Sequence, residues 1–115
     1  MAGSAGLKTL IAVIGRSDLE EVRKDVERAL GVTLEAHDSL YMGGAYYGAG
    51  RKGGETITLS RNYVYAMDDC LEAEYKDWPL LLRVYMTPRG SELAQALGQV
   101  PQLSVVRVSP SATGP

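Results

Sequence analysis

The chain has 115 residues, of which 45% are hydrophobic and 23% charged, and its formal net charge is −2 at pH 7. This length fits one domain with its own core, so we expect a single domain over residues 1–115, with flexible tails at 1–6 and 109–115. A nearly neutral chain lacks the basic field that attracts nucleic-acid backbones. We therefore expect no nucleic-acid partner.

No apolar run approaches the roughly 20 residues that a membrane-spanning helix needs. The apolar residues 7–14 lack the charged leader of a signal peptide, and a helix start follows them directly. Cys70 is the only cysteine, which rules out an intrachain disulfide and fits a reducing compartment. We expect a cytoplasmic protein with no membrane association.

The first predicted elements are a strand and a helix. Apolar and β-branched residues predominate over residues 7–14, which predicts a central strand. Ser17 and Glu20 then form the S-x-x-E capping box, in which two side chains satisfy amides at a helix start. Apolar residues recur at helical spacing as far as Leu30, and Gly31 supplies the left-handed residue expected just past a helix end.

Three strands are predicted next. Residues 32–36 indicate a short strand, residues 37–39 a turn, and residues 40–48, which mix tyrosine with glycine, a bent or bulged strand. The glycine-rich residues 48–54 are interpreted as a flexible connection. Residues 55–65 alternate between apolar and hydroxyl side chains, which predicts the second strand of a hairpin.

The C-terminal part predicts a strand, a helix and a last strand. The run PLLLRVYMT, residues 79–87, is typical of a strand buried on most sides. Pro88 marks a helix entry, Gly98 the helix end, and residues 103–108 the last strand. The order β-α-β-β-β-β-α-β predicts an α+β two-layer sandwich, a mostly antiparallel sheet with both helices on one face, related to the ferredoxin-like pattern.

The glycine-rich segment partly matches two phosphate-binding motifs, and its context fits neither. Gly48, Gly50 and Gly53 match G-x-G-x-x-G, but a strand follows them where the dinucleotide motif needs a helix N-terminus. The Walker pattern fails because Lys52 is followed by glycine and not by a hydroxyl residue. A hairpin loop explains these glycines, and we expect no cofactor.

Cysteine and metal chemistry are also disfavoured. Carboxylates around Cys70 raise the pKa of a thiol, the opposite of what a reactive thiolate needs. The same carboxylates lack the spacing and the glycine of a calcium loop, and zinc would require more histidine or cysteine than this chain holds. We expect no catalytic residue and no metal site, although an enzyme using His37, Arg61 and tyrosines from several strands stays open.

The most informative stretch is MDDCLEAEYKDW, residues 67–78, with five carboxylates against one lysine. It connects two predicted strands. One interpretation is a solvated loop, since charge runs commonly serve solubility. The other is a contact surface, in which aromatic side chains supply contact energy and carboxylates steer a basic partner. The candidate partner-binding residues are Asp68, Asp69, Glu72, Glu74, Tyr75, Asp77 and Trp78.

The segments GGAYYGAG, GGETITLSRNY and DWPLLLRVYMT resemble parts of small bacterial immunity-type proteins that are encoded beside toxins. The resemblance covers residues 39–87: a glycine-bearing tyrosine strand, an alternating strand, and an acidic connection to a buried strand. It implies a non-enzymatic inhibitor that covers a toxin's active site or a neighbouring exosite. Acidic immunity surfaces are typical where the toxin is a nuclease with a basic groove.

Two functions follow from these observations. The first is a cytoplasmic protein-binding module, an immunity-type inhibitor whose partner is a toxin with a basic surface. The alternative is a small-molecule-binding or regulatory α+β domain that acts as a homodimer. In that alternative the glycine-tyrosine strand borders a ligand pocket, because glycine admits close approach and tyrosine offers both a ring and a hydroxyl.

Overall fold

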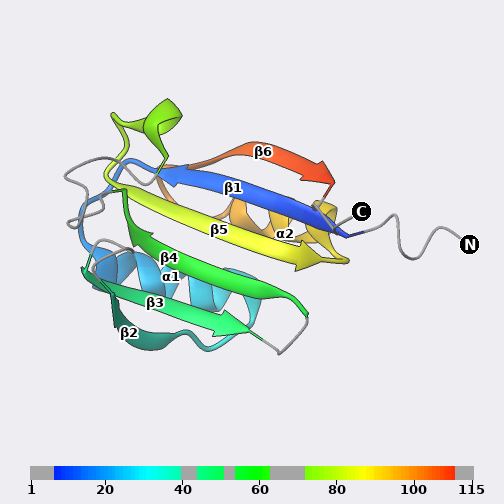
Figure 1. The fold of residues 1–115 in the computed structure, drawn as a ribbon, viewed down its shortest axis with the longest axis horizontal. Coiled ribbons are helices and arrows are strands. Elements are labelled where there is room, and N and C mark those ends of the chain that lie inside the picture. The colour runs from blue at the N-terminus through cyan, green and yellow to red at the C-terminus, as the bar shows by residue number, and fades with distance from the viewer. Residues whose placement is uncertain (1–6, 40–43, 51–53, 63–71, 111–115) are drawn as a thin grey trace, which may run out of the picture.

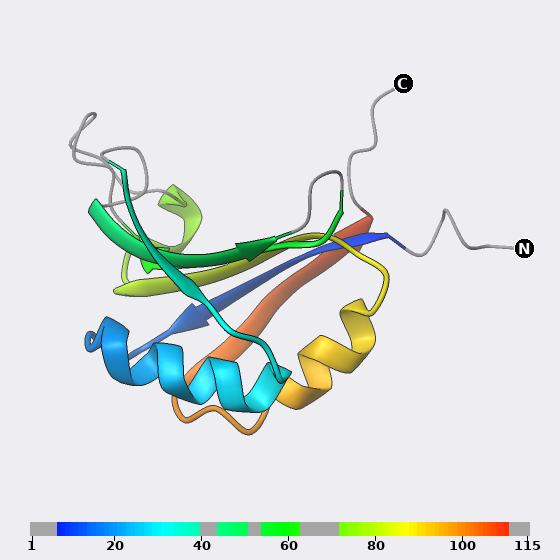
Figure 2. The same ribbon diagram turned by 90° about the horizontal axis from the view of Figure 1, so that it is seen from below.

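The computed structural model describes residues 7–39, 44–50, 54–62 and 72–110. Six strands form one sheet, and both helices cover the same face of it (Figures 1 and 2). The predicted α+β class and element order are confirmed. The elements are β1 (Lys8–Ile14), α1 (Leu19–Leu30), β2 (Glu35–Ser39), β3 (Gly44–Gly50), β4 (Thr56–Arg61), the 3₁₀ helix η3 (Ala73–Tyr75), β5 (Leu80–Thr87), α2 (Gly90–Leu97) and β6 (Leu103–Pro110).

The strand order in the sheet is β2-β3-β4-β5-β1-β6, and all five neighbouring pairs are antiparallel. β1 lies between β5 and β6, so the first strand is interior, as its apolar sequence predicts. The two edges are β2 and β6. Within the described ranges, no helix has the length and apolarity needed to cross a membrane.

The main core lies between the sheet and the helices. Leu10, Ala12 and Ile14 of β1 alternate toward the helices and join a buried cluster with residues such as Val22 of α1 and Leu97 of α2. Burying one such aliphatic side chain contributes about 1.5–3 kcal/mol relative to leaving it exposed. This packing holds both helices on one face of the sheet and leaves the opposite face without a helix.

The start of α1 differs from the prediction by one residue. The N-cap is Asp18, whose carboxylate accepts a 3.1 Å hydrogen bond from the backbone N–H of Glu21, so the assignment of the cap to Ser17 is wrong. The helix begins at Leu19, so its third residue is Glu21, and the Glu20 side chain bonds Arg23 and Tyr47 instead. The helix end is confirmed: Gly31 is left-handed, with φ of 68°.

The predicted turn at residues 37–39 is wrong. His37 and Asp38 lie within β2 and pair with Tyr46 and Ala45 of β3. Strand propensity of the sequence EAHDS is low, so the pairing with β3 decides its structure. β2 therefore begins and ends later than expected.

Other strand ends shift by a few residues. β3 continues to Gly50, so the first three residues of the expected flexible connection belong to a strand. β6 continues through Pro110, two residues past its predicted end. The remaining residues of the expected tails, 1–6 and 111–115, lie outside the described ranges, as do 40–43 and 51–53.

Candidate functional site

The sheet has one face that neither helix covers, called here the helix-free face (Figure 2). Because side chains alternate along a strand, the residues between the core positions point to this face. Cross-strand pairing sets Glu35, Gly48, Thr58 and Arg83 in one row across β2, β3, β4 and β5. The helix-free face therefore combines residues that are far apart in the sequence.

One end of this face carries the described part of the predicted contact segment, residues 72–78, called here the acidic turn. η3 forms its middle and stands on the side of the sheet opposite the helices (Figure 2). Beneath this side, Val13 and Leu81 are fully buried although they belong to the strand positions that point away from the helical core. Asp68 and Asp69, the first two predicted contact residues, lie outside the described ranges.

Asn62, just after β4, holds the acidic turn in place. Its side-chain amide donates to the carbonyls of Tyr75 (2.8 Å) and Glu72 (3.3 Å), and its side-chain oxygen accepts from the Glu72 N–H at 2.8 Å. Its own N–H donates to the Pro79 carbonyl at 3.0 Å. Asn62 is only 7% exposed, so these bonds are shielded from water. These hydrogen bonds hold residues 72–78 against the end of β4.

Two of the predicted contact carboxylates are paired within the chain. Glu72 lies 3.4 Å from the guanidinium of Arg83 in β5, which is 12% exposed, and Glu74 lies 2.8 Å from that of Arg107 in β6. Arg83 also lies over the Tyr85 ring, 5.9 Å from its centroid. These pairs lower the negative charge that the turn offers to a partner. Among the turn's described acids, Asp77 is exposed and enters no ion pair of the described residues.

The side chains of Tyr75 and Trp78 are partly buried, so only part of each ring is open to a partner. A Cβ built on Gly15 would lie 3.5 Å from the Trp78 ring, so the indole packs against the chain just after β1. The backbone N–H of Trp78 donates to the Tyr75 carbonyl at 3.0 Å. Both rings thus offer a fixed, partial surface to a partner.

The other end of the helix-free face is hollowed into a cavity of about 310 Å³, called here the glycine-floored depression. The residues that shape it come from β2, β3 and β4: Glu35, His37, Tyr46, Gly48, Thr56 and Thr58. His37 and Tyr46 stack with ring centroids 5.3 Å apart. Sequence reasoning missed this group because it placed His37 in a turn. The mixture of glycine and tyrosine in β3 was the one available signal.

His37 and Arg61, the pair considered for an unfamiliar enzyme, do not share this depression. Arg61 is not among its lining residues, and its guanidinium donates to the Ala45 carbonyl at 3.4 Å. Strand alternation also separates them, since Arg61 follows Ser60 and Leu59 in β4 and so points to the face of Leu59, the helix side.

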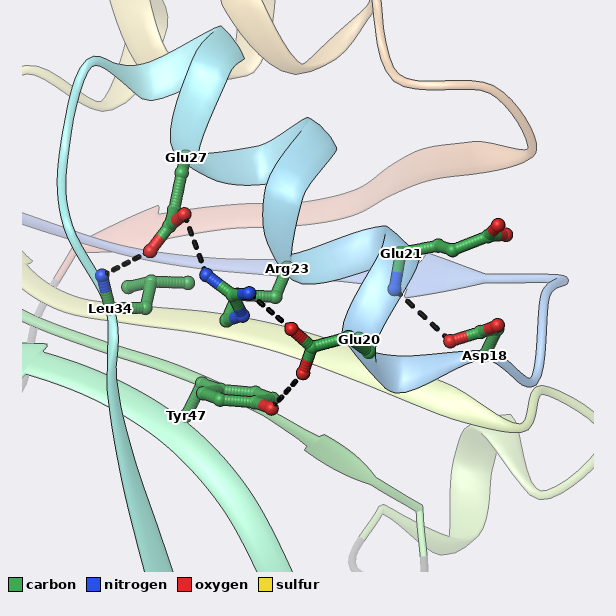
Figure 3. Close-up of polar contacts among 7 residues, drawn as sticks. All are labelled: Asp18, Glu20, Glu21, Arg23, Glu27, Leu34 and Tyr47. Carbon is green, nitrogen blue, oxygen red and sulfur yellow. Dashed lines mark hydrogen bonds and ion pairs between the residues drawn. The ribbon is translucent and has the colours of Figure 1, made fainter.

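On the helix side, α1 is tied to β3 by a charged network (Figure 3). Arg23 pairs with Glu20 and with Glu27, the latter at 2.9 Å, and its guanidinium lies 5.1 Å from the centroid of the Tyr47 ring. The Tyr47 hydroxyl donates to Glu20. Hydrogen bonding from Arg23, and then from Tyr47, lowers the pKa of Glu20 below its ordinary value, while Glu20 raises the pKa of Tyr47. We interpret the network as a clamp that orients the β2–β3 hairpin.

A second clamp joins the start of β4 to the start of α2. Arg89 donates to both oxygens of Glu55, at 2.8 and 3.0 Å, and the fully buried Thr87 donates to the same carboxylate at 2.6 Å. The pair borders a cavity of about 560 Å³ with apolar walls that include Val32 and Met86. Both carboxylate oxygens of Glu55 are therefore used inside the chain.

The described residues form no metal-binding site. No group of three or more histidine, cysteine or acidic side chains is arranged there to hold an ion. Asp68, Asp69 and Cys70 lie outside those ranges.

No protein-family model matches the chain, and no curated protein matches it either.

Proposed function

We propose that this chain is a non-enzymatic, cytoplasmic protein-binding module that presents the helix-free face of its sheet to a basic protein. One observation carries the proposal. The face that the helices leave free has a fixed acidic turn at one end and a depression with a carboxylate and two aromatic rings at the other. Aromatic side chains in a fixed position supply contact area at low entropic cost, and carboxylates steer a basic partner.

The form of binding that we propose is that of an immunity-type inhibitor, which neutralises a toxin by stoichiometric association. The basis is the sequence resemblance over residues 39–87, the segment that contains β3, β4, β5 and the acidic turn. The internal pairing of Glu72 and Glu74 refines the earlier expectation. Shape and aromatic area of the acidic turn contribute the contact energy, while Asp77 and Glu35 supply the charge that steers the partner.

The test is affinity capture from lysate of the source cells with the tagged full chain as bait, followed by titration calorimetry of the purified partner. The matched variants are Asp77→Asn on the acidic turn and Glu92→Gln on α2, two exposed carboxylates on opposite sides of the molecule. We expect 1:1 binding that Asp77→Asn weakens and Glu92→Gln does not. A partner that responds to Glu92→Gln alone would contradict the proposal, and a captured toxin should lose its toxicity when co-expressed with the chain.

A second candidate function, a small-molecule-binding homodimer, is favoured by two specific observations. The glycine-floored depression borders the glycine-tyrosine strand β3, where the alternative function needs a pocket. The edge strand β6 exposes Val106 (39%) and Val108 (44%), side chains suited to strand pairing between two copies. Light scattering and a metabolite screen by thermal shift test this candidate. A dimer with a metabolite-dependent melting temperature would favour it over the first.

A further inference from the structure

The glycine-floored depression owes its shape to a missing side chain. Gly48 stands in β3 between Glu35 of β2 and Thr58 of β4, directly paired with both. A Cβ at Gly48 would lie 3.3 Å from the Ile57 carbonyl oxygen and 3.6 Å from both the His37 and the Tyr46 ring. A Cβ there would touch both rings and approach the Ile57 carbonyl tightly, so a larger side chain would occupy the space beside the rings. With glycine, the floor is bare backbone that a flat group can approach closely.

The walls of the depression provide an aromatic surface. Tyr46 is half-buried, and its ring stacks on His37 with an angle of 28° between the planes. Because the two rings brace each other, the Tyr46 ring is held beside the glycine floor. An aromatic ring in a fixed position attracts a cation placed against its face.

Among the described residues that line the depression, Glu35 is the only charged one. Glu35 is exposed and enters no salt bridge of the described residues. Its neighbour across the strand pair is Gly48, so no side chain there competes for its carboxylate. Arg83, in the same row, is directed to Glu72 instead. A ligand that matches this rim carries positive charge.

We propose that the glycine-floored depression is a subsite for an arginine side chain of the basic partner. The guanidinium would lie on the Gly48 backbone against the Tyr46 ring and donate two hydrogen bonds to Glu35. Arginine fits better than lysine because its guanidinium is planar, stacks on aromatic faces and matches a carboxylate with a pair of parallel donors. This inference rests on the proposed function and deepens it by naming the chemistry that the partner inserts.

The subsite can be tested without the partner. ¹⁵N-labelled full chain is titrated with N-acetyl-arginine amide, with the neutral isostere N-acetyl-citrulline amide and with N-acetyl-lysine amide. We expect saturable shifts of the Glu35, Gly48 and Thr58 amide signals with the arginine compound, weaker ones with lysine and none with citrulline. Equal responses to arginine and citrulline, or no response to arginine, would overturn the subsite.

Matched variants separate a specific subsite from general attraction of cations. Glu35→Gln and Asp38→Asn each remove one negative charge from β2, but Asp38 pairs with Ala45 and so points to the opposite face. Loss of the charge-assisted bonds should weaken arginine binding about tenfold in Glu35→Gln. Asp38→Asn should bind as the parent does. Equal weakening by both substitutions would contradict the proposal.

A third variant tests the floor. Gly48→Val should abolish the arginine response by filling the depression, and the amide spectrum of the variant shows whether the sheet is retained. Where Gly48→Val fails to fold, Tyr46→Leu replaces it, since it removes the ring and leaves the floor. An unchanged arginine response in the folded variant would overturn the subsite.

The outcomes for the subsite and for the proposed function are distinguishable. A partner whose binding weakens with Asp77→Asn, together with a chain that ignores N-acetyl-arginine amide, keeps the protein-binding function and removes the subsite. Specific arginine binding, together with a partner that binds the helix side, keeps the subsite and removes the proposed function. Weakened partner binding by Glu35→Gln and not by Asp38→Asn supports both.

Discussion

The Tyr47 hydroxyl of β3 donates a hydrogen bond to Glu20 of α1, and the same carboxylate is paired with Arg23. Arg23 in turn lies over the Tyr47 ring, so the three groups contact one another in a closed set (Figure 3). Through this set the first turns of α1 are joined to the strand that carries Tyr46 and Gly48 on its other face. The orientation of the helix-free face thus depends on contacts made on the helix side.

The network predicts a pH-dependent contribution to stability. The pKa of Glu20 is lowered in the folded state, so its contribution is present above the unfolded value of about 4.5 and is lost as the pH falls through the folded pKa. Glu20→Gln should therefore destabilise the protein slightly at pH 7 and by less at pH 3, because protonation of Glu20 weakens its bonds below pH 4.5. Urea unfolding of parent and variant at both pH values measures this. Glu92→Gln, at an exposed carboxylate that no hydrogen bond or salt bridge joins to another described side chain, is the control; a constant difference at both pH values would argue against the network.

At alkaline pH the same network predicts the opposite trend for Tyr47. Its pKa is raised above the ordinary value of 10.0, first by the bond to Glu20 and then by burial, because the neutral hydroxyl is favoured in the folded state. The contribution is full below pH 10 and is lost as the pH rises through the folded pKa. Ultraviolet titration of tyrosinate should show one tyrosine ionising late, and Tyr47→Phe should remove that late step. Persistence of the late step in Tyr47→Phe would assign it to another residue.

Asn62 should be the residue on which the acidic turn depends. Asn62→Ala removes three side-chain hydrogen bonds and leaves the amide of Glu72 without its acceptor, so we expect a loss of about 1–3 kcal/mol in unfolding free energy. Hydrogen exchange should accelerate at Glu72 and Trp78. Ser104→Ala, at an exposed position of β6, is the control and should leave both amides unchanged. Unaltered exchange at Glu72 in Asn62→Ala would show that the turn is held by other contacts.

The Glu55–Arg89 clamp should distinguish arginine from lysine. Arg89→Lys keeps the charge but cannot reproduce the paired bonds to both carboxylate oxygens. Since the Arg89 side chain is 37% exposed, the expected loss is modest, about 1 kcal/mol or less. Denaturant unfolding measures it, and Arg28→Lys, at a 79% exposed position of α1, serves as the control. Equal losses for the two substitutions would show that the geometry of the Arg89 pair contributes nothing.

Gly31 should be required for its backbone conformation alone. Its φ is 68°, and a Cβ there would meet no atom within 4 Å, so the cost of Gly31→Ala is conformational and about 1–2 kcal/mol. Asparagine tolerates the left-handed region better, so Gly31→Asn should cost less than Gly31→Ala. Thermal unfolding of the two variants tests this order. The reverse order would mean that a contact with residues outside the described ranges, and not the backbone conformation, determines the cost of substitution.

Local patterns predicted the elements whose residues carry their own signal. The apolar run of β5 and the helical spacing that ends at Gly31 were read correctly because burial and capping act over neighbouring residues. β2 was misplaced because His37, Asp38 and Ser39 were interpreted as a turn, and only pairing with β3 makes them a strand. No local pattern reports that pairing.

The site was less predictable because it depends on register. The acidic turn was identified from its composition, but the arginines that pair with it, Arg83 and Arg107, lie 11 and 33 residues from their carboxylates. The juxtaposition of Glu35 with Gly48 likewise requires the β2–β3 register, and a shift by one residue would send Glu35 to the other face. The composition of the sequence therefore identified the acidic turn. The strand pairing determines which of its carboxylates are paired with arginine and which are available to a partner.

The interior position of β1 has a consequence for how the protein is made. Both neighbours of β1 come late in the chain, β5 at Leu80–Thr87 and β6 at Leu103–Pro110. While the chain is being synthesised, this apolar strand therefore leaves the ribosome long before either of its partners exists. Until β5 and β6 emerge, its edges are unpaired and the side chains that the folded protein buries are exposed. Both features favour aggregation of partly synthesised chains. β6 thus closes the core around β1.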